Sequence, residues 1–131
     1  MKSGTSVAIA MLATTLISTP VFAEKVLNAE EVTALISGMT VTERPAKKDT
    51  EQTAYYDANG TVKSIRKDKS VAGKWKVNKT GQLCIKKKKK FRCHLIVEEN
   101  GSYGKYRVKK DDQRKLKANY LSFTAGNPNS Y

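Results

Sequence analysis

Residues 75–97 read WKVNKTGQLCIKKKKKFRCHLIV and carry the strongest structural pattern in this chain of 131 residues. Cys84 and Cys93, the only cysteines, flank a basic run that contains five consecutive lysines and Arg92. From 91 to 97 the residues alternate as expected of a strand, with Phe, Cys, Leu and Val on one face and Arg, His and Ile on the other. The stretch therefore predicts a β-hairpin in which 82–86 pairs with 91–98 and the lysines form the tip.

The segments on both sides of this hairpin also have strand patterns. In 71–78, small or apolar residues alternate with lysines, and we interpret Trp75 as a core anchor rather than as a residue that stacks on a carbohydrate. Asn59-Gly60 and Asn100-Gly101 are pairs that tight hairpin turns prefer. The other predicted strands are one followed by a loop over 39–49, then 53–57, 61–66 and 103–109. Segment 113–124 fits either a short helix or a strand over 117–124, and we favour the strand.

A short helix is predicted near the start of the domain, at 29–37. Asn28 and Glu31 have capping-box spacing before an apolar stripe, and Gly38 supplies a residue that can end the helix. Residues 125–131 are expected to form a polar tail. The predicted fold class is therefore mainly β, a small antiparallel meander or barrel-like sheet with a short N-terminal α-helix and one disulfide.

The first 23 residues have the pattern of a secretory signal peptide, with Lys2 before a short apolar run and with Val21 and Ala23 at the cleavage positions. Cleavage after Ala23 would leave one small domain, 24–131, that is periplasmic or secreted and not transmembrane. In such an oxidising compartment the two cysteines are expected to form a disulfide, worth about 2 to 3 kcal/mol. Without Lys2 the chain has 24 basic and 12 acidic residues, and the net charge of +12 favours an anionic partner.

Groups suited to catalysis are scarce in this sequence. His94 is the only histidine, and strand alternation places it on the opposite face from Cys93, so a Cys–His nucleophile pair is not expected. One histidine and two cysteines do not complete the usual tetrahedral zinc set, and no phosphate-binding loop motif occurs. The sequence therefore predicts a non-enzymatic protein with no cofactor and no metal.

The basic block is the candidate binding surface. If consecutive strands pair, the lysine-rich loop over 86–90 would converge with basic residues of the neighbouring strands, including Lys105 and Arg107, and bind anions in a salt-dependent way. The expected partner is an anionic lipid headgroup, an acidic polysaccharide or an acidic protein, whereas export disfavours nucleic acid. The predicted contact residues are Lys74, Lys76, Lys86, Lys87, Lys88, Lys89, Lys90 and Arg92.

Three alternatives to this interpretation stay open. The lysines could form a solvated loop that only protects a sheet edge from aggregation. The protein could instead be a small-molecule carrier with an apolar interior lined by residues such as Trp75 and Leu95. It could also be a purely structural envelope protein.

Several short motifs follow one another along the chain. They are Gly38-x-Thr40, Tyr55-Tyr56-x-x-x-Gly60-Thr61, Gly73-x-Trp75-x-Val77, Leu83-Cys84, Cys93 and Gly126-Asn127-Pro128. In this order the chain resembles a family of small exported bacterial proteins to which no activity or ligand is assigned. The resemblance implies a compact β domain with a bridge between Cys84 and Cys93. The five-lysine insert departs from the family pattern, and we interpret it as a specialisation of this chain.

Overall fold

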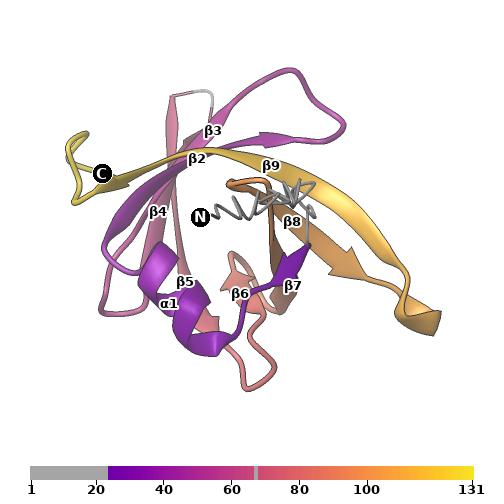
Figure 1. The fold of residues 1–131 in the computed structure, drawn as a ribbon. Coiled ribbons are helices and arrows are strands. Elements are labelled where there is room, and N and C mark those ends of the chain that lie inside the picture. The colour runs from indigo at the N-terminus through magenta and orange to yellow at the C-terminus, as the bar shows by residue number, and fades with distance from the viewer. Residues whose placement is uncertain (1–23, 67) are drawn as a thin grey trace, which may run out of the picture.

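The computed structural model describes residues 24–66 and 68–131, so the predicted signal peptide over 1–23 lies outside the described residues. Within that part, antiparallel strands β2 to β9 form a closed barrel in which each strand pairs with the next and β9 pairs with β2 (Figure 1). The strands are β2 (Met39–Pro45), β3 (Gln52–Tyr56), β4 (Thr61–Arg66), β5 (Lys69–Val77), β6 (Leu83–Lys86), β7 (Phe91–Glu99), β8 (Ser102–Val108) and β9 (Arg114–Ala125). The prediction of a mainly β, barrel-like fold is confirmed.

Segment 113–124, which fitted either a helix or a strand, lies almost entirely in the last strand, β9. β9 is longer than the strand favoured from the sequence, and its first residues follow the 3-10 helix η1 (Lys110–Asp112). A further strand, β1 (Lys25–Val26), was not expected and pairs with β7 beyond Leu83, where β6 begins. Two residues are too few to show an alternating pattern, which is why the sequence did not indicate β1.

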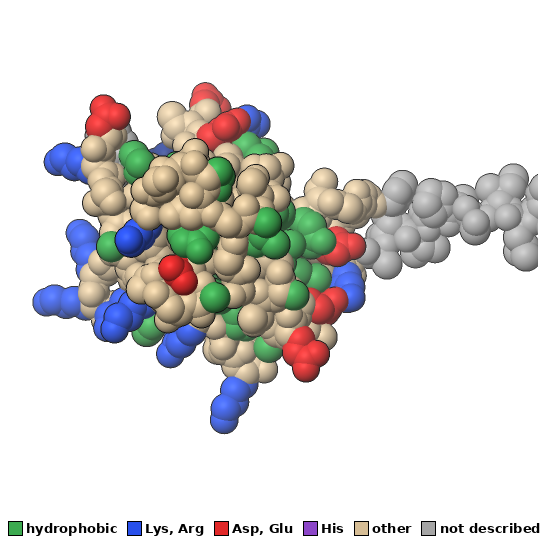
Figure 2. Space-filling view, turned by 90° about the vertical axis from the view of Figure 1, so that its left-hand side faces the viewer, with side chains coloured by type: hydrophobic (Ala, Val, Ile, Leu, Met, Phe, Trp, Pro, Cys, Tyr) green, Lys and Arg blue, Asp and Glu red, His purple; other side chains and the backbone are tan. Residues whose placement is uncertain are grey.

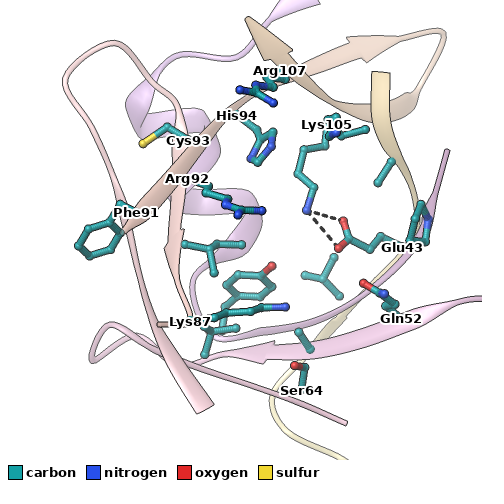
Figure 3. A pocket seen from close by; sticks show the side chains of 18 of the residues that line it. Glu43, Gln52, Ser64, Lys87, Phe91, Arg92, Cys93, His94, Lys105 and Arg107 are labelled. Carbon is teal, nitrogen blue, oxygen red and sulfur yellow. Dashed lines mark hydrogen bonds and ion pairs between the residues drawn. The ribbon is translucent and has the colours of Figure 1, made fainter. Parts of the chain in front are cut away.

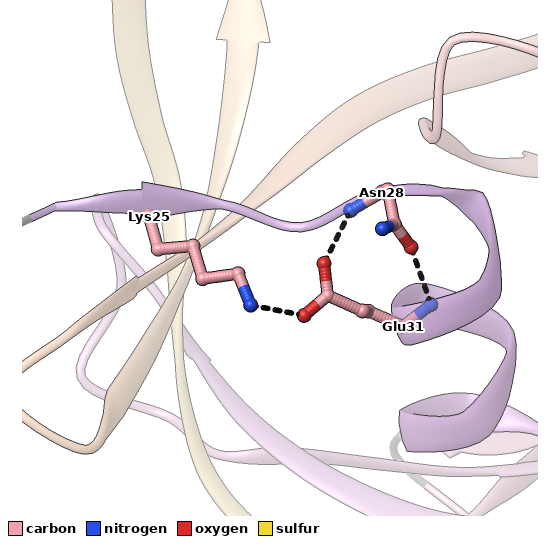
Figure 4. Close-up of polar contacts among 3 residues, drawn as sticks. All are labelled: Lys25, Asn28 and Glu31. Carbon is pink, nitrogen blue, oxygen red and sulfur yellow. Dashed lines mark hydrogen bonds and ion pairs between the residues drawn. The ribbon is translucent and has the colours of Figure 1, made fainter.

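The helix α1 (Ala29–Ile36) begins with the predicted capping box (Figure 4). The backbone N–H of Glu31 donates to Oδ1 of Asn28 at 2.9 Å, and the backbone N–H of Asn28 donates to Oε1 of Glu31 at 3.1 Å. Lys25 forms an ion pair with the same glutamate. Gly38, two residues after the helix, has φ of +73°, as the predicted terminator requires.

The helix covers one end of the barrel and completes its core. Val32 and Ile36 are fully buried and belong to one apolar cluster with Tyr56 and Trp75 from the barrel interior. The Trp75 ring is 8% exposed, packs edge-on against Tyr56 with ring centroids 5.9 Å apart, and donates its Nε1–H to the carbonyl oxygen of Asp57 at 2.8 Å. The tryptophan is thus a core residue, in line with the strand alternation.

The predicted hairpin of β6 and β7 carries the disulfide. Cys84 and Cys93 stand directly opposite each other in the ladder, with Cα atoms 4.0 Å apart, and their sulfur atoms are bonded. Lys86 is the last residue of β6, so the connection consists of residues 87–90, which we call the lysine loop. Cys84 lies three residues before the lysine loop and Cys93 three residues after it. The disulfide therefore joins the two strands at the same distance from the loop. Among residues 24–66 and 68–131, no helix has the length and apolar character needed to cross a membrane.

Candidate functional site

A cavity of about 1180 Å³ lies inside the barrel, at the end away from α1 (Figure 3). Its lining comes from β2, β3, β4, β6, β7, β8 and β9, together with the lysine loop at the mouth. At the other end of the barrel, the helix and the buried cluster around Trp75 fill the interior. Strand closure therefore leaves a pocket that is closed at its floor and open beside the lysine loop.

One side of this cavity is strongly basic. On β7 the side chains of Arg92 and His94 point inward, Arg107 of β8 lies near His94, and Lys105 of β8 extends to Glu43 (Figure 3). Lys117 of β9 continues the same side. We call these five residues the cationic wall, which consists of four lysine or arginine residues with His94 among them. They are brought together because β7, β8 and β9 are consecutive neighbours in the barrel. On β7 and β8 they are alternate residues, and Lys117 is the extra residue of β9 at the register shift between β8 and β9.

Charge around the cavity is very uneven. Among the described lining residues, Glu43 is the only carboxylate, whereas nine carry a lysine or arginine side chain. These nine are Lys48, Lys87, Lys88, Lys89, Lys90, Arg92, Lys105, Arg107 and Lys117. The field inside the cavity must therefore be positive, and the low-dielectric walls strengthen it.

The carboxylate of Glu43 forms an ion pair with Lys105. Nζ of Lys105 lies 2.8 Å from Oε2 and 3.1 Å from Oε1 of Glu43, and the two side chains are only 10% and 16% exposed. Burying either charge alone would cost several kcal/mol, and the attraction between the two charges offsets this desolvation cost only while they stay paired. Glu43 thus offsets one cation and leaves the rest of the lining positive.

The pKa of His94 is lowered by burial and by the neighbouring positive charges. Burial, followed by the charges of Lys105, Lys117, Arg107 and Arg92, lowers the pKa of His94 to about 4. The imidazole is therefore neutral at neutral pH. Its Nδ1 atom is buried and has no hydrogen-bond partner among the residues that the structure describes.

The opposite side of the cavity is largely apolar and comes from β2, β3, β4 and β6. Val41, Tyr56 and Val62 are each less than 5% exposed, and Ala54 and Ile85 complete this apolar wall. Burial raises the pKa of the Tyr56 hydroxyl. Ser64, Thr53 and Gln52 lie on the same strands and add polar groups beside the apolar patch.

The predicted contact residues fall into two groups. Lys74 and Lys86 face each other across β5 and β6 on the outer surface, and they do not line the cavity. Lys76 lies beside them, with its Nζ 4.3 Å from the ring centroid of the partly exposed Phe91. Only the four lysines of the loop and Arg92 reach the cavity. The expectation that all these cations converge on one side is wrong, because neighbouring strand residues point alternately out of and into the barrel.

Leu95 also needs a correction, since it was expected in the interior. It does not line the cavity, and the inward residues of β7 are Arg92, His94 and, in the core, Ile96. Both faces of this strand contain apolar residues. The sequence pattern therefore predicted that residues alternate between two faces, but not which face points into the barrel. Glu43, Lys48 and Lys117 were missed because they belong to strands and loops distant in sequence that only barrel closure brings to the cavity.

The outer face shown in Figure 2 carries both basic and acidic side chains. On the face shown in Figure 2, Lys and Arg side chains project separately along the margins, and acidic side chains lie between or opposite them. No group of three or more His, Cys, Asp or Glu side chains is arranged to hold a metal in the described part of the chain. The cavity, and not this outer face, is the place where charge is concentrated on one side.

Comparisons with protein-family models, with curated protein sequences and with solved structures gave no match.

Proposed function

We propose that this chain is a non-enzymatic binding protein that takes up an anionic ligand in the barrel cavity beneath the lysine loop. The observation that carries this proposal is the lining of the cavity, where nine lysine and arginine residues accompany a single glutamate. The cavity volume of about 1180 Å³ lies at or above the upper end of typical ligand sites. The arrangement is therefore concave and predominantly positive, which suits an anionic ligand.

The energetics favour uptake of an anion over an empty cavity. The cations of the cationic wall repel one another, and burial of His94, followed by the charges of these cations, lowers the pKa of its imidazole. An anion placed among them would relieve the repulsion and gain charge-assisted hydrogen bonds, which are about twice as strong as neutral ones. Arg92 and Arg107 offer planar donor groups that suit carboxylate or phosphate oxygens.

The lysine loop has a place in this proposal as the entrance. Its lysines are flexible point charges at the mouth, which suits them to attracting an anion and guiding it inward. The protein is proposed to act after export, in the periplasm or outside the cell, where an anionic envelope component such as a lipid headgroup is the leading ligand. An acidic polysaccharide or acidic protein could contact the loop, but a concave site favours a ligand small enough to enter.

The cavity also joins two interpretations that the sequence kept apart. A carrier needs an interior space, and a salt-sensitive anion binder needs a cluster of cations. Both are features of one cavity here, so we propose one site rather than a surface loop and a separate apolar interior. No specific observation favours the structural envelope protein.

Binding can be tested with methyl phosphate as the probe and NMR as the readout. The chain has one histidine and one tryptophan, so each ring gives a single set of signals. We expect a saturable shift of the His94 resonance that weakens when salt rises from about 50 to about 200 mM. Replacing Arg107 by glutamine should weaken binding about tenfold, by loss of a hydrogen bond to a charged group.

Lys74→Gln is the matched control, because it removes the same charge from the outer surface. This variant should change the affinity less than about twofold, since Lys74 is exposed, does not line the cavity, and its charge is screened by salt. The proposal is overturned if methyl phosphate leaves the His94 signal unmoved at both salt concentrations, or if Lys74→Gln and Arg107→Gln weaken binding equally. Vesicles containing phosphatidylglycerol form a second arm, which reports whether a membrane-held headgroup reaches the same residues.

A further inference from the structure

We infer that the ligand is an anionic amphiphile with a single apolar chain, whose charged group lies against the cationic wall while its chain lies against the apolar wall. This inference rests on the proposed function and names the ligand class for the same cavity. Two features of the cavity carry it, namely the division of its lining into two sides and its volume.

The division follows from the strands that supply each side. The cationic wall comes from β7, β8 and β9, whereas the apolar wall comes from β2, β3, β4 and β6. The two sides meet where Ile85 of β6 stands opposite Arg92 of β7 in the ladder. A ligand that fills the cavity must therefore be charged on one side and apolar on the other.

The apolar wall also extends deeper than the charges at the mouth. Val41, Tyr56 and Val62 lie at the ends of their strands that are close to α1, and all three are almost fully buried. Below them, the Tyr56 ring packs edge-on against Trp75, so the apolar surface is continuous with the core. A chain could thus leave water without meeting an unpaired charge.

The volume excludes a bare anion as the fitting ligand. A cavity of about 1180 Å³ is large compared with a phosphate or carboxylate group, so such an ion would leave the partly exposed side chains of the apolar wall, Ala54 and Ile85, in contact with water. Filling that wall with an alkyl chain removes apolar surface from water, which is favourable by about 0.8 kcal/mol for each methylene. The site therefore gains affinity from a chain that a small hydrophilic anion cannot supply.

A series of alkyl phosphates tests this inference directly. Methyl, butyl, hexyl and octyl phosphate carry the same charged group, and each is used below the concentration at which it forms micelles. We expect the affinity to rise about fourfold for each added methylene, the factor that corresponds to about 0.8 kcal/mol. The indole signal of Trp75 should shift with the longer members, because Tyr56 connects its ring to the apolar wall.

Two isoleucine variants separate the apolar wall from general effects. Ile85→Ala removes apolar surface from the cavity and should lower the ratio of octyl to methyl phosphate affinity several-fold. Ile65→Ala makes the same chemical change at a residue that is 44% exposed and does not line the cavity, so that ratio should stay constant. A cavity variant that no longer folds is replaced by Ile85→Val, for which a smaller drop in the same direction is expected.

The outcomes distinguish this inference from the proposed function. If methyl and octyl phosphate bind equally well with a salt-sensitive shift of His94, the amphiphile is refuted and the anion site stands. If uncharged octanol binds as tightly as octyl phosphate, the ligand is not an anion and both proposals fail. Binding that rises with chain length, requires the charge and responds to Ile85 but not to Ile65 supports the amphiphile.

Discussion

Replacing His94 by glutamine should remove a pH-dependent part of the stability of this barrel. The folded-state pKa of His94 is about 4, against an ordinary value of 6.5. As pH falls from about 7, the unfolded chain takes up a proton on this ring before the folded chain does, so the free energy of unfolding decreases. Above pH 6.5 the contribution is fully present, and it is lost as pH falls toward 4. The difference between the two pKa values, at about 1.36 kcal/mol per unit, gives an upper limit of about 3.4 kcal/mol for the loss in the free energy of unfolding.

Solvent reduces this value, because the ring is only partly buried. With screening we expect the wild-type protein to lose about 1 to 2 kcal/mol more than His94→Gln between about pH 7 and about pH 4. Urea denaturation of both proteins at several pH values measures the difference, and the carboxylates shared by both proteins cancel in it.

An NMR titration of the same ring gives an independent check. Since the chain has one histidine, the imidazole signal needs no assignment and reports the folded-state pKa directly. A measured pKa of about 6 or above would refute the reasoning, and so would parallel stability curves for the two proteins. Repeating the titration with methyl phosphate should raise the pKa of His94, because a nearby anion favours the charged imidazolium.

Three further changes test the framework around the cavity. Replacing Cys84 and Cys93 by serine should lower the free energy of unfolding in urea by about 2 to 3 kcal/mol through the loss of a short ring, and a loss below about 1 kcal/mol would contradict this. Gly73→Ala should cost about 1 to 3 kcal/mol in thermal unfolding, because the added Cβ would lie 2.5 Å from the carbonyl oxygen of Lys86; an unchanged melting temperature would argue against that close approach. Glu43→Gln should destabilise the protein by about 3 to 5 kcal/mol, since its lysine partner is left buried and unpaired, and yet strengthen methyl phosphate binding; weaker binding would show that the glutamate helps to hold the anion.

Most of the fold could be predicted because its signals are local. Alternation over 71–78 and 91–98, the Asn-Gly turns and the capping box at Asn28 each concern a few adjacent residues, and the structure confirms them. The disulfide followed from the presence of only two cysteines placed opposite each other in a hairpin. These features depend on backbone geometry, which short sequence patterns describe well.

The cavity could not be predicted in the same way, because it depends on barrel closure. Period-two alternation shows that Arg92 and Cys93 face opposite sides, but it does not show which side is the interior. On β7 the Cys93 side chain points away from the cavity and the Arg92 side chain points into it (Figure 3), even though cysteine is the residue type more often buried. Glu43 and Lys105 are 62 residues apart in sequence, and their pairing requires both ends of the sheet to meet.

The barrel is held closed by backbone hydrogen bonds between strands, whereas the cavity is lined by side chains. Along β2 to β9, main-chain groups pair with neighbouring strands, while the inward side chains at alternate positions take little part in those bonds. The disulfide at Cys84 and Cys93 keeps the base of the lysine loop fixed whichever residues occupy the loop. Exchanging Arg92 or Ile85 could therefore redirect ligand preference without rebuilding the barrel, and the chain offers a compact starting point for engineering receptors with chosen selectivity.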